Sequence, residues 1–216
     1  MSLVRYVVDN WGTLGPQVVT HVQIVAISML AAGLIGLGLG VVAARSERFS
    51  ALILSVTSTI LTVPSFALFG LLTIWVGFGN PPVIVGLVLY ALLPVVRNTA
   101  TGIRAVDPAV TEAARGMGMS PTQVLTRVEL PLAAPAILGG LRQATVMVVA
   151  IATVGATVGA DDLGQPILEA LGRSSGTLVQ VLAGVIPVAV IGLVADGALA
   201  GVQHVLARGA SRAATG

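Results

Sequence analysis

The chain has 216 residues, of which 56% are apolar and 9% are charged, and its formal net charge is +2. Together with a mean hydropathy of +0.99, this composition excludes an ordinary soluble domain and indicates an all-α integral membrane protein. All eleven basic residues are arginines and cysteine is absent, which excludes a lysine-containing P-loop, disulfides and cysteine metal sites in this chain. The small net charge favours arginines at a membrane surface over binding of nucleic acid.

Five apolar segments are long enough to cross a hydrocarbon core of roughly 30 Å. A shorter segment, residues 1–16, carries an apolar helical face and is predicted to lie on the membrane surface. We predict a single transmembrane domain over 17–208 and a flexible C-terminal tail over 209–216. The predicted spans are 18–44, 51–76, 82–102, 135–158 and 178–206.

The second predicted span contains Pro64 near its middle. Proline removes one backbone hydrogen bond, so we expect a kink whose freed carbonyl, near Val63, is satisfied by Ser65 or by water. A kink at this place serves either as a gate or as a packing device. The sequence leaves both interpretations open.

Arginines indicate how the five spans are oriented. Successive spans cross the membrane in alternating directions. The arginines after span one, between spans three and four, and after span five therefore lie on the same side of the membrane. Arg5 and Arg173 lie on the opposite side. Cytoplasmic loops are enriched in arginine, so we predict an external N-terminus and a cytoplasmic C-terminus. The arginines on the predicted cytoplasmic side are Arg45, Arg48, Arg104, Arg115, Arg127, Arg208 and Arg212.

The fourth predicted span contains Arg142 and the fifth contains Asp196, each about two turns from the cytoplasmic end. An unpaired charge is costly there, and no chain of further ionisable groups crosses the membrane beside them, so we predict a structural ion pair rather than a proton relay. His21, at the outer end of span one, is predicted to be interfacial.

Glycines four residues apart predict close packing between helices, because lipid supplies no hydrophobic drive for their association. The alternative is coincidence, since the chain has 26 glycines. The pairs are Gly36 and Gly40, Gly155 and Gly159, and Gly197 and Gly201.

The loop between the third and fourth predicted spans, residues 103–133, is unusually polar. Asp107 followed by Pro108 is an N-cap and first-turn pair, so we expect a helix from there to about residue 115, where flexible glycines around Gly118 interrupt it.

A second short helix follows in the same loop. Ser120 and Gln123 have the spacing of a capping box, in which each side chain bonds to the other residue's backbone N–H. Pro131 is expected to stop or sharply bend this helix. Two short helices joined by glycines predict a protruding knob.

The order of residues in this loop resembles a known motif. Glu112-Ala113-Ala114 is followed by Gly118. Nine residues separate Gly118 from Val128, and one residue separates Val128 from Leu130-Pro131. The pattern resembles the signature loop of permease subunits of bacterial type I ABC importers. The resemblance implies a five-helix transmembrane core whose cytoplasmic coupling loop, 103–133, inserts into a groove on an ATPase subunit.

The resemblance implies roles for the loop residues. Glu112 is expected to offer charge-assisted hydrogen bonds to the ATPase, Ala113 and Ala114 to be small where the loop fits its groove, and Gly118 to permit the turn. In the alternative interpretation Glu112 is a surface carboxylate paired with Arg115 or Arg104. The predicted ATPase-coupling residues are Glu112, Ala113, Ala114, Arg115, Gly116, Met117, Gly118, Met119 and Ser120.

Further blocks resemble the permeases of osmoprotectant importers, which carry glycine betaine, carnitine or choline; these blocks are 63–68, 89–94, 97–99, 106–108 and 116–119. A permease for methionine or another amino acid is the alternative. The resemblance implies a multi-pass protein of a bacterial cell membrane with two ATP-binding subunits, a second permease copy or paralogue, and an extracellular substrate-binding protein as partners. Candidates for the substrate pathway or gate are Val63, Pro64, Ser65, Phe66, Tyr90 and Asn98.

Residues 159–164 depart from the pattern of these permeases, because Asp161 and Asp162 stand where two glycines are usual. We interpret the two carboxylates as part of a solvated outer loop; the alternative is contact with a cationic substrate or its binding protein. Two adjacent carboxylates without a nearby histidine are a poor metal site.

The remaining function classes find little support in the sequence. Two distant histidines and no cysteine leave nothing from which to build a nucleophilic or metal centre, so we expect neither enzymatic activity nor a cofactor. A secondary transporter is disfavoured because no internal repeat is visible.

Overall fold

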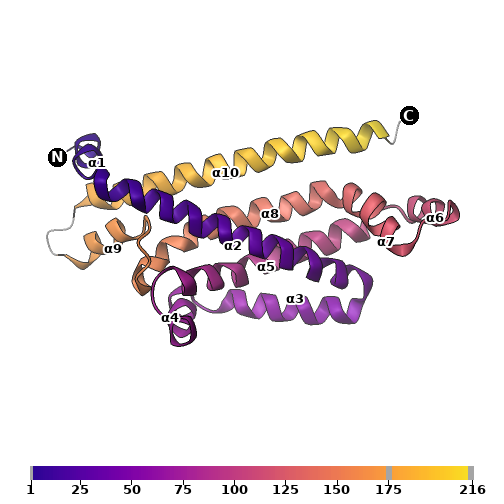
Figure 1. The fold of residues 1–216 in the computed structure, drawn as a ribbon, viewed down its shortest axis with the longest axis horizontal. Coiled ribbons are helices and arrows are strands. Elements are labelled where there is room, and N and C mark those ends of the chain that lie inside the picture. The colour runs from indigo at the N-terminus through magenta and orange to yellow at the C-terminus, as the bar shows by residue number, and fades with distance from the viewer. Residues whose placement is uncertain (1, 174–176, 214–216) are drawn as a thin grey trace.

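The computed structural model describes residues 2–173 and 177–213, with side chains up to Leu206, and these ranges contain helices and turns but no strand. Figure 1 shows an elongated bundle in which long helices run side by side. The elements are α1 (Leu3–Asp9), α2 (Trp11–Arg45), α3 (Glu47–Thr62), α4 (Ser65–Val76), α5 (Asn80–Arg104), α6 (Pro108–Gly116), α7 (Pro121–Val124), a π-helical turn (Leu125–Glu129), α8 (Leu130–Ala152), a 3-10 turn (Thr153–Val158), α9 (Gln165–Gly172) and α10 (Leu178–Ala213).

Helix α5 is the central element of the bundle. It packs against α2 on one side and α8 on the other, and α8 in turn packs against α10. The core residues Leu87, Tyr90 and Val95 of α5 are nearly inaccessible to solvent. By contrast, α2 and α10 expose many large apolar side chains, as expected for helices that face lipid or another membrane subunit.

The five predicted spans correspond to four long apolar helices and one bent pair. The first span begins earlier than predicted, because α2 starts at Trp11 and continues through Pro16. Within the segment 1–16, α1 has seven residues and the residues from Trp11 onward belong to α2; its position on the membrane surface stays a prediction. At the other end of the chain, α10 continues to Ala213, within the segment 209–216 for which we predicted a tail; residues 214–216 lie outside the described residues.

The predicted kink at Pro64 is a complete break. Helices α3 and α4 are bent by 101° relative to each other, so α4 leaves the direction of the bundle. The Tyr90 hydroxyl donates a 2.7 Å hydrogen bond to the carbonyl of Val63. The expectation that Ser65 or water satisfies this carbonyl is therefore wrong, because the core of α5 supplies the donor.

Most of the predicted cytoplasmic arginines lie at one end of the bundle. The C-termini of α2 and α5, which carry Arg45 and Arg104, lie beside α6 and α7, and α10 ends toward the same side (Figure 1). We call this the α6–α7 end, and the opposite end, with α1 and α9, the α9 end. The side chains of Arg208 and Arg212 lie outside the described residues.

Candidate functional site

The polar loop 103–133 begins with helix α6, as predicted. The Asp107 carboxylate accepts a 2.8 Å hydrogen bond from the backbone N–H of Ala109, which caps the helix, and Pro108 occupies its first turn. The helix ends at Gly116. Local capping chemistry therefore determines where α6 starts.

An elbow joins α6 to α7. Gly118 has φ +85°, a left-handed conformation that glycine adopts without steric cost. Beyond the elbow, Ser120 and Gln123 form the predicted capping box: the Gln123 side chain accepts from the Ser120 N–H at 2.8 Å, and the Ser120 hydroxyl accepts from the Gln123 N–H at 3.3 Å. The capping box thereby gives hydrogen-bond acceptors to two backbone N–H groups at the start of α7 that have no partner within the helix.

Most of the predicted coupling residues are accessible. Met117 is 73% exposed, whereas Ala114 is only 2% exposed, so Ala114 packs inside its own chain and only Ala113 of the two alanines remains available to a partner. Met119 is half-buried. The exposed members are Glu112, Ala113, Arg115, Gly116, Met117, Gly118 and Ser120.

Glu112 forms no ion pair within the described part of the chain. One predicted alternative partner, Arg104, instead donates to the backbone carbonyls of Ala43 at 2.6 Å and Ala44 at 3.4 Å, at the end of α2. The carboxylate of Glu112 is thus left exposed on the surface of the loop.

A π-helical turn connects α7 to α8 without a break. The N–H of Leu130 donates to the carbonyl of Leu125, five residues earlier, and Pro131 follows in the first turn of α8. The expectation that Pro131 stops or sharply bends the helix is wrong, because the chain stays helical from Pro121 to Val158 and Pro131 lies just after the π-helical turn, where the hydrogen-bond register changes. The helical segment that contains the fourth predicted span therefore begins before residue 135.

The π-helical turn contains the one acidic residue of the loop that is buried. Glu129 is 4% exposed and accepts hydrogen bonds on both carboxylate oxygens from the guanidinium of Arg45, one of them at 3.0 Å. Sequence analysis did not identify this pair; its only signal was a charged residue within the Val128-Glu129-Leu130-Pro131 block. A cleft of about 220 Å³ opens beside the pair, lined by Arg45, Arg115, Pro121, Thr122, Val124, Leu125 and Glu129.

The predicted pathway residues do not form one cluster. Val63, Pro64 and Phe66 are exposed at the break between α3 and α4 and Ser65 is half-buried, whereas Tyr90 is 2% exposed and bonded to the break from inside. Asn98 lies further along α5, half-buried, where its amide donates to the carbonyl of Pro94 at 2.8 Å.

The two charges predicted to pair within the spans are in contact. The Arg142 guanidinium donates two hydrogen bonds, of 2.8 and 2.9 Å, to the two oxygens of Asp196. Gln203 extends the network, since it accepts from Arg142 at 2.8 Å and donates to the carbonyl of Pro135 at 2.7 Å. The network joins α8 to α10.

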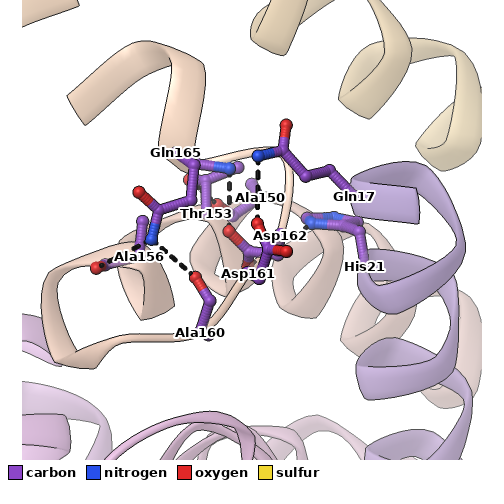
Figure 2. A network of polar contacts seen from close by, with 10 residues as sticks. Gln17, His21, Ala150, Thr153, Ala156, Ala160, Asp161, Asp162 and Gln165 are labelled. Carbon is purple, nitrogen blue, oxygen red and sulfur yellow. Dashed lines mark hydrogen bonds and ion pairs between the residues drawn. The ribbon is translucent and has the colours of Figure 1, made fainter. Parts of the chain in front are cut away.

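A second polar network lies at the α9 end (Figure 2). Asp161 is exposed and accepts a 3.0 Å hydrogen bond from Gln17. Asp162 is fully buried, accepts from the N–H of Gly164 at 2.8 Å, and lies 3.6 Å from Nδ1 of His21, which is also fully buried. The expectations of an interfacial His21 and of a solvated Asp162 are therefore wrong. The network ties the start of α2 to the loop before α9.

Metal-ligating residues do not gather in the described part of the chain: no group of three or more histidines, cysteines, aspartates or glutamates lies close enough to hold an ion.

Comparison with known proteins gives one consistent result. Residues 36–206 match the family described as the inner membrane component of binding-protein-dependent transport systems. The carnitine transport permease protein OpuCD of Listeria monocytogenes is 36% identical over 95% of this chain and 94% of its own. The osmoprotectant import permease protein OsmW of Salmonella typhimurium is 36% identical over 95% of this chain and 97% of its own.

The glycine betaine/carnitine/choline transport system permease protein OpuCD of Bacillus subtilis is 38% identical over 90% of this chain and 85% of its own. Among solved structures, the inward-facing methionine ABC transporter MetNI matches with a TM-score of 0.79 at 20% identity, over 91% of this chain and 97% of that chain, which establishes a shared fold. The chain belongs to the family of inner membrane components of binding-protein-dependent transport systems, and it is a multi-pass membrane protein.

Proposed function

We propose that the chain is the permease subunit of an ATP-driven importer for osmoprotectants of the quaternary ammonium class, and that the coupling loop, residues 103–133, is its docking site for an ATPase subunit. The observation that carries the docking proposal is the exposed, internally capped knob of α6 and α7 at the end of the bundle where α2, α5 and α8 meet. A rigid knob with an unpaired carboxylate at Glu112 suits insertion into a groove of a partner.

The choice of cargo rests on the relatives. The relatives that are 33–39% identical over at least 90% of this chain are named as permeases for carnitine, choline, glycine betaine or osmoprotectants. The methionine transporter shares the fold at 20% identity. The relatives therefore favour an osmoprotectant over methionine or another amino acid as cargo.

The partners follow from what this chain contributes. Its family works with a binding protein, and we propose that a substrate-binding protein docks at the α9 end, outside the cell, while two ATP-binding subunits dock at the α6–α7 end in the cytoplasm. A second permease copy or paralogue completes the transmembrane pathway. ATP-driven approach of the two ATPases then displaces the knob and reorients the helices around the pathway.

The break between α3 and α4 supports a pathway on that face. Non-helical backbone at membrane depth is tolerated where protein or water covers it, not where it faces lipid. The exposed Val63 and Pro64 are therefore expected to face the second permease or a water-filled path, with Ser65 and Phe66 beside them. Buried Tyr90 and half-buried Asn98 are proposed to support this face from α5.

Docking is tested by the Gly118→Asp variant in cells that carry the complete importer. Because residue 118 requires a positive φ, aspartate strains the elbow and places a charge there, and we expect ATPase co-purification and uptake to fall by about tenfold or more. For ATPase co-purification the matched control is Gly172→Asp, which makes the same change on exposed α9 at the opposite end of the bundle, where an added Cβ meets nothing among the described residues. A wild-type chain that brings down no ATPase subunit, or a Gly118→Asp variant with normal uptake, would contradict the docking proposal.

The cargo is tested separately with radiolabelled glycine betaine, carnitine, choline and methionine. We expect the binding protein that co-purifies with this chain to bind one or more of the first three and not methionine. Binding of methionine alone would move the proposal to the amino-acid alternative while leaving the docking site in place.

A further inference from the structure

We propose that the Arg45–Glu129 ion pair is the junction through which displacement of the coupling loop reaches α2, so that Arg45 and Glu129 are positioning residues for energy coupling. The inference rests on the proposed function, because it requires an ATPase that displaces the loop. It goes beyond docking, because the pair links two elements of this chain, the end of α2 and the π-helical turn before α8.

The covalent connections of the loop leave α2 out. The chain enters the loop from α5 and leaves it into α8, whereas α2 is separated from the loop by α3, α4 and α5. Helix α2 nevertheless packs along α5 through much of its length. A displacement of α6 and α7 can therefore move α2 directly only through side-chain contacts at its end.

The π-helical turn brings Glu129 into position for such a contact. A π turn holds one more residue than an α-helical turn, which rotates the residues on either side of it by about 100° relative to an uninterrupted helix. Such turns are often found at functional sites. Here the turn spans Leu125–Glu129, and its last residue is the buried one that bonds to α2.

The pair is built for a firm link. Both oxygens of Glu129 accept from the guanidinium of Arg45, the last residue of α2, and such two-point pairs are the strongest and most directional side-chain links between elements. The carboxylate is 4% exposed, so water does not replace its partner. Arg104 of α5 donates to the carbonyls of Ala43 and Ala44 beside it. The end of α2 is thus held from two sides.

Arg115, the other arginine of the cleft, differs from Arg45 in its contacts. Arg115 lines the same cleft, but in the described part of the chain it forms no ion pair and its side chain is exposed. It remains available to the ATPase, whereas Arg45 is committed to Glu129. The two arginines of the cleft therefore have different roles, one in contact with the partner and one within the permease.

The test uses the complete importer in proteoliposomes, with ATP hydrolysis and uptake of radiolabelled glycine betaine, carnitine and choline measured on the same samples. The variant Arg45→Gln with Glu129→Gln removes the pair without leaving a charge buried. Its matched control is Glu47→Gln with Arg48→Gln, which removes one charge of each sign from exposed positions at the same end. We expect the pair variant to keep its ATPase subunits and its hydrolysis while the amount imported per ATP falls about tenfold, and the control to match the wild type.

A second arm separates charge pairing from shape. The exchange Arg45→Glu with Glu129→Arg restores a pair with reversed polarity, and we expect it to recover most of the lost import per ATP relative to Glu129→Arg alone. An unchanged import per ATP in the glutamine pair variant, or loss of its ATPase subunits, would overturn the inference. The wild-type sample reports on the proposed function, because absence of hydrolysis-driven uptake there contradicts the importer itself rather than the junction.

Discussion

Single glycines on α2 control how closely this helix approaches α5. A Cβ atom added at Gly36 would lie 2.7 Å from a methyl group of Val95, and one at Gly40 would overlap the side chain of Thr99. Helices in lipid associate through close packing and hydrogen bonds, so a missing side chain contributes directly to their contact. By contrast, a Cβ atom added at Gly197 or Gly201 of α10 would have no neighbour within 4 Å in the described part of the chain.

Replacement of Gly40 by alanine tests this packing. The added methyl group collides with Thr99, so we expect a loss of roughly 1–3 kcal/mol in the free energy of unfolding, measured by thermal or denaturant unfolding in detergent. Gly38→Ala is the matched control, because it lies half a turn away on the same helix and an added Cβ meets open space. Equal stability of the two variants would show that the α2–α5 contact relaxes around the methyl group.

Tyr90 acts at the same scale, by satisfying a backbone carbonyl at the break between α3 and α4. Tyr90→Phe leaves the carbonyl of Val63 without its donor, and we expect a loss of about 1–3 kcal/mol in the free energy of unfolding in detergent. The control is Tyr6→Phe on α1, the other tyrosine of the chain, which is half-buried. If water replaces the lost hydroxyl without cost, the two variants will unfold at the same temperature.

At the scale of elements, polar contacts join helices that the chain does not connect directly. Arg142 of α8 and Asp196 of α10 form one such contact, and Gln203 adds a second link from α10 to the start of α8. We propose that this network is structural. Paired charges inside membrane spans hold helices in register, because separation exposes each charge to lipid.

The α8–α10 contact is tested by removing one charge and then both. Asp196→Ala leaves Arg142 without its partner, so we expect the midpoint of thermal unfolding to fall by roughly 2–4 °C, with partial recovery in the variant that also carries Arg142→Ala. Glu169→Ala is the control, because its pair with Arg173 is exposed and separated by 3.4 Å. A double variant whose loss equals the sum of the losses in Asp196→Ala and in Arg142→Ala would indicate that the two residues act independently.

At the scale of the whole molecule, the bundle has two polar ends with different roles. The α6–α7 end carries Arg45, Arg104 and the coupling loop, whereas the α9 end carries the buried Asp162 and His21. From the positive-inside rule we propose that the first end lies in the cytoplasm. The proposed docking of ATPases at this end and of a binding protein at the other requires this orientation.

Labelling of single cysteines tests the orientation. The chain has no cysteine, so a membrane-impermeant maleimide reports only on introduced sites. We expect the Glu169→Cys variant, exposed on α9, to be labelled in intact cells, and the Met117→Cys variant, at the exposed tip of the knob, only after permeabilisation. The reverse pattern would invert the proposed topology.

The parts that sequence analysis predicted correctly depend on neighbouring residues or on composition. Caps at Asp107 and Ser120 act over two or three residues, so the form of α6 and α7 follows from the local sequence. The same holds for the membrane class and for the family, which rest on apolar length and on the spacing of the Glu112 to Pro131 motif. The consequence of Pro131 was mispredicted, because the helix changes its hydrogen-bond register in the π-helical turn just before the proline and continues past it.

Apart from the Arg142–Asp196 contact, which the sequence predicted because both charges lie within spans, tertiary structure alone decided which polar groups are buried and what they contact. Glu129 and Arg45 are 84 residues apart, and Gln17 bonds to a residue 144 positions away, so no local pattern distinguishes them from solvated charges. Ala114 and Ala113 are likewise indistinguishable in the sequence, and only the packing of α6 makes Ala114 buried and leaves Ala113 exposed. The sequence by itself determined the membrane spans, the capped knob and the family, since these depend on hydrophobicity and short-range hydrogen bonds; the fold determined the links between helices, since burial and pairing depend on which distant segments meet.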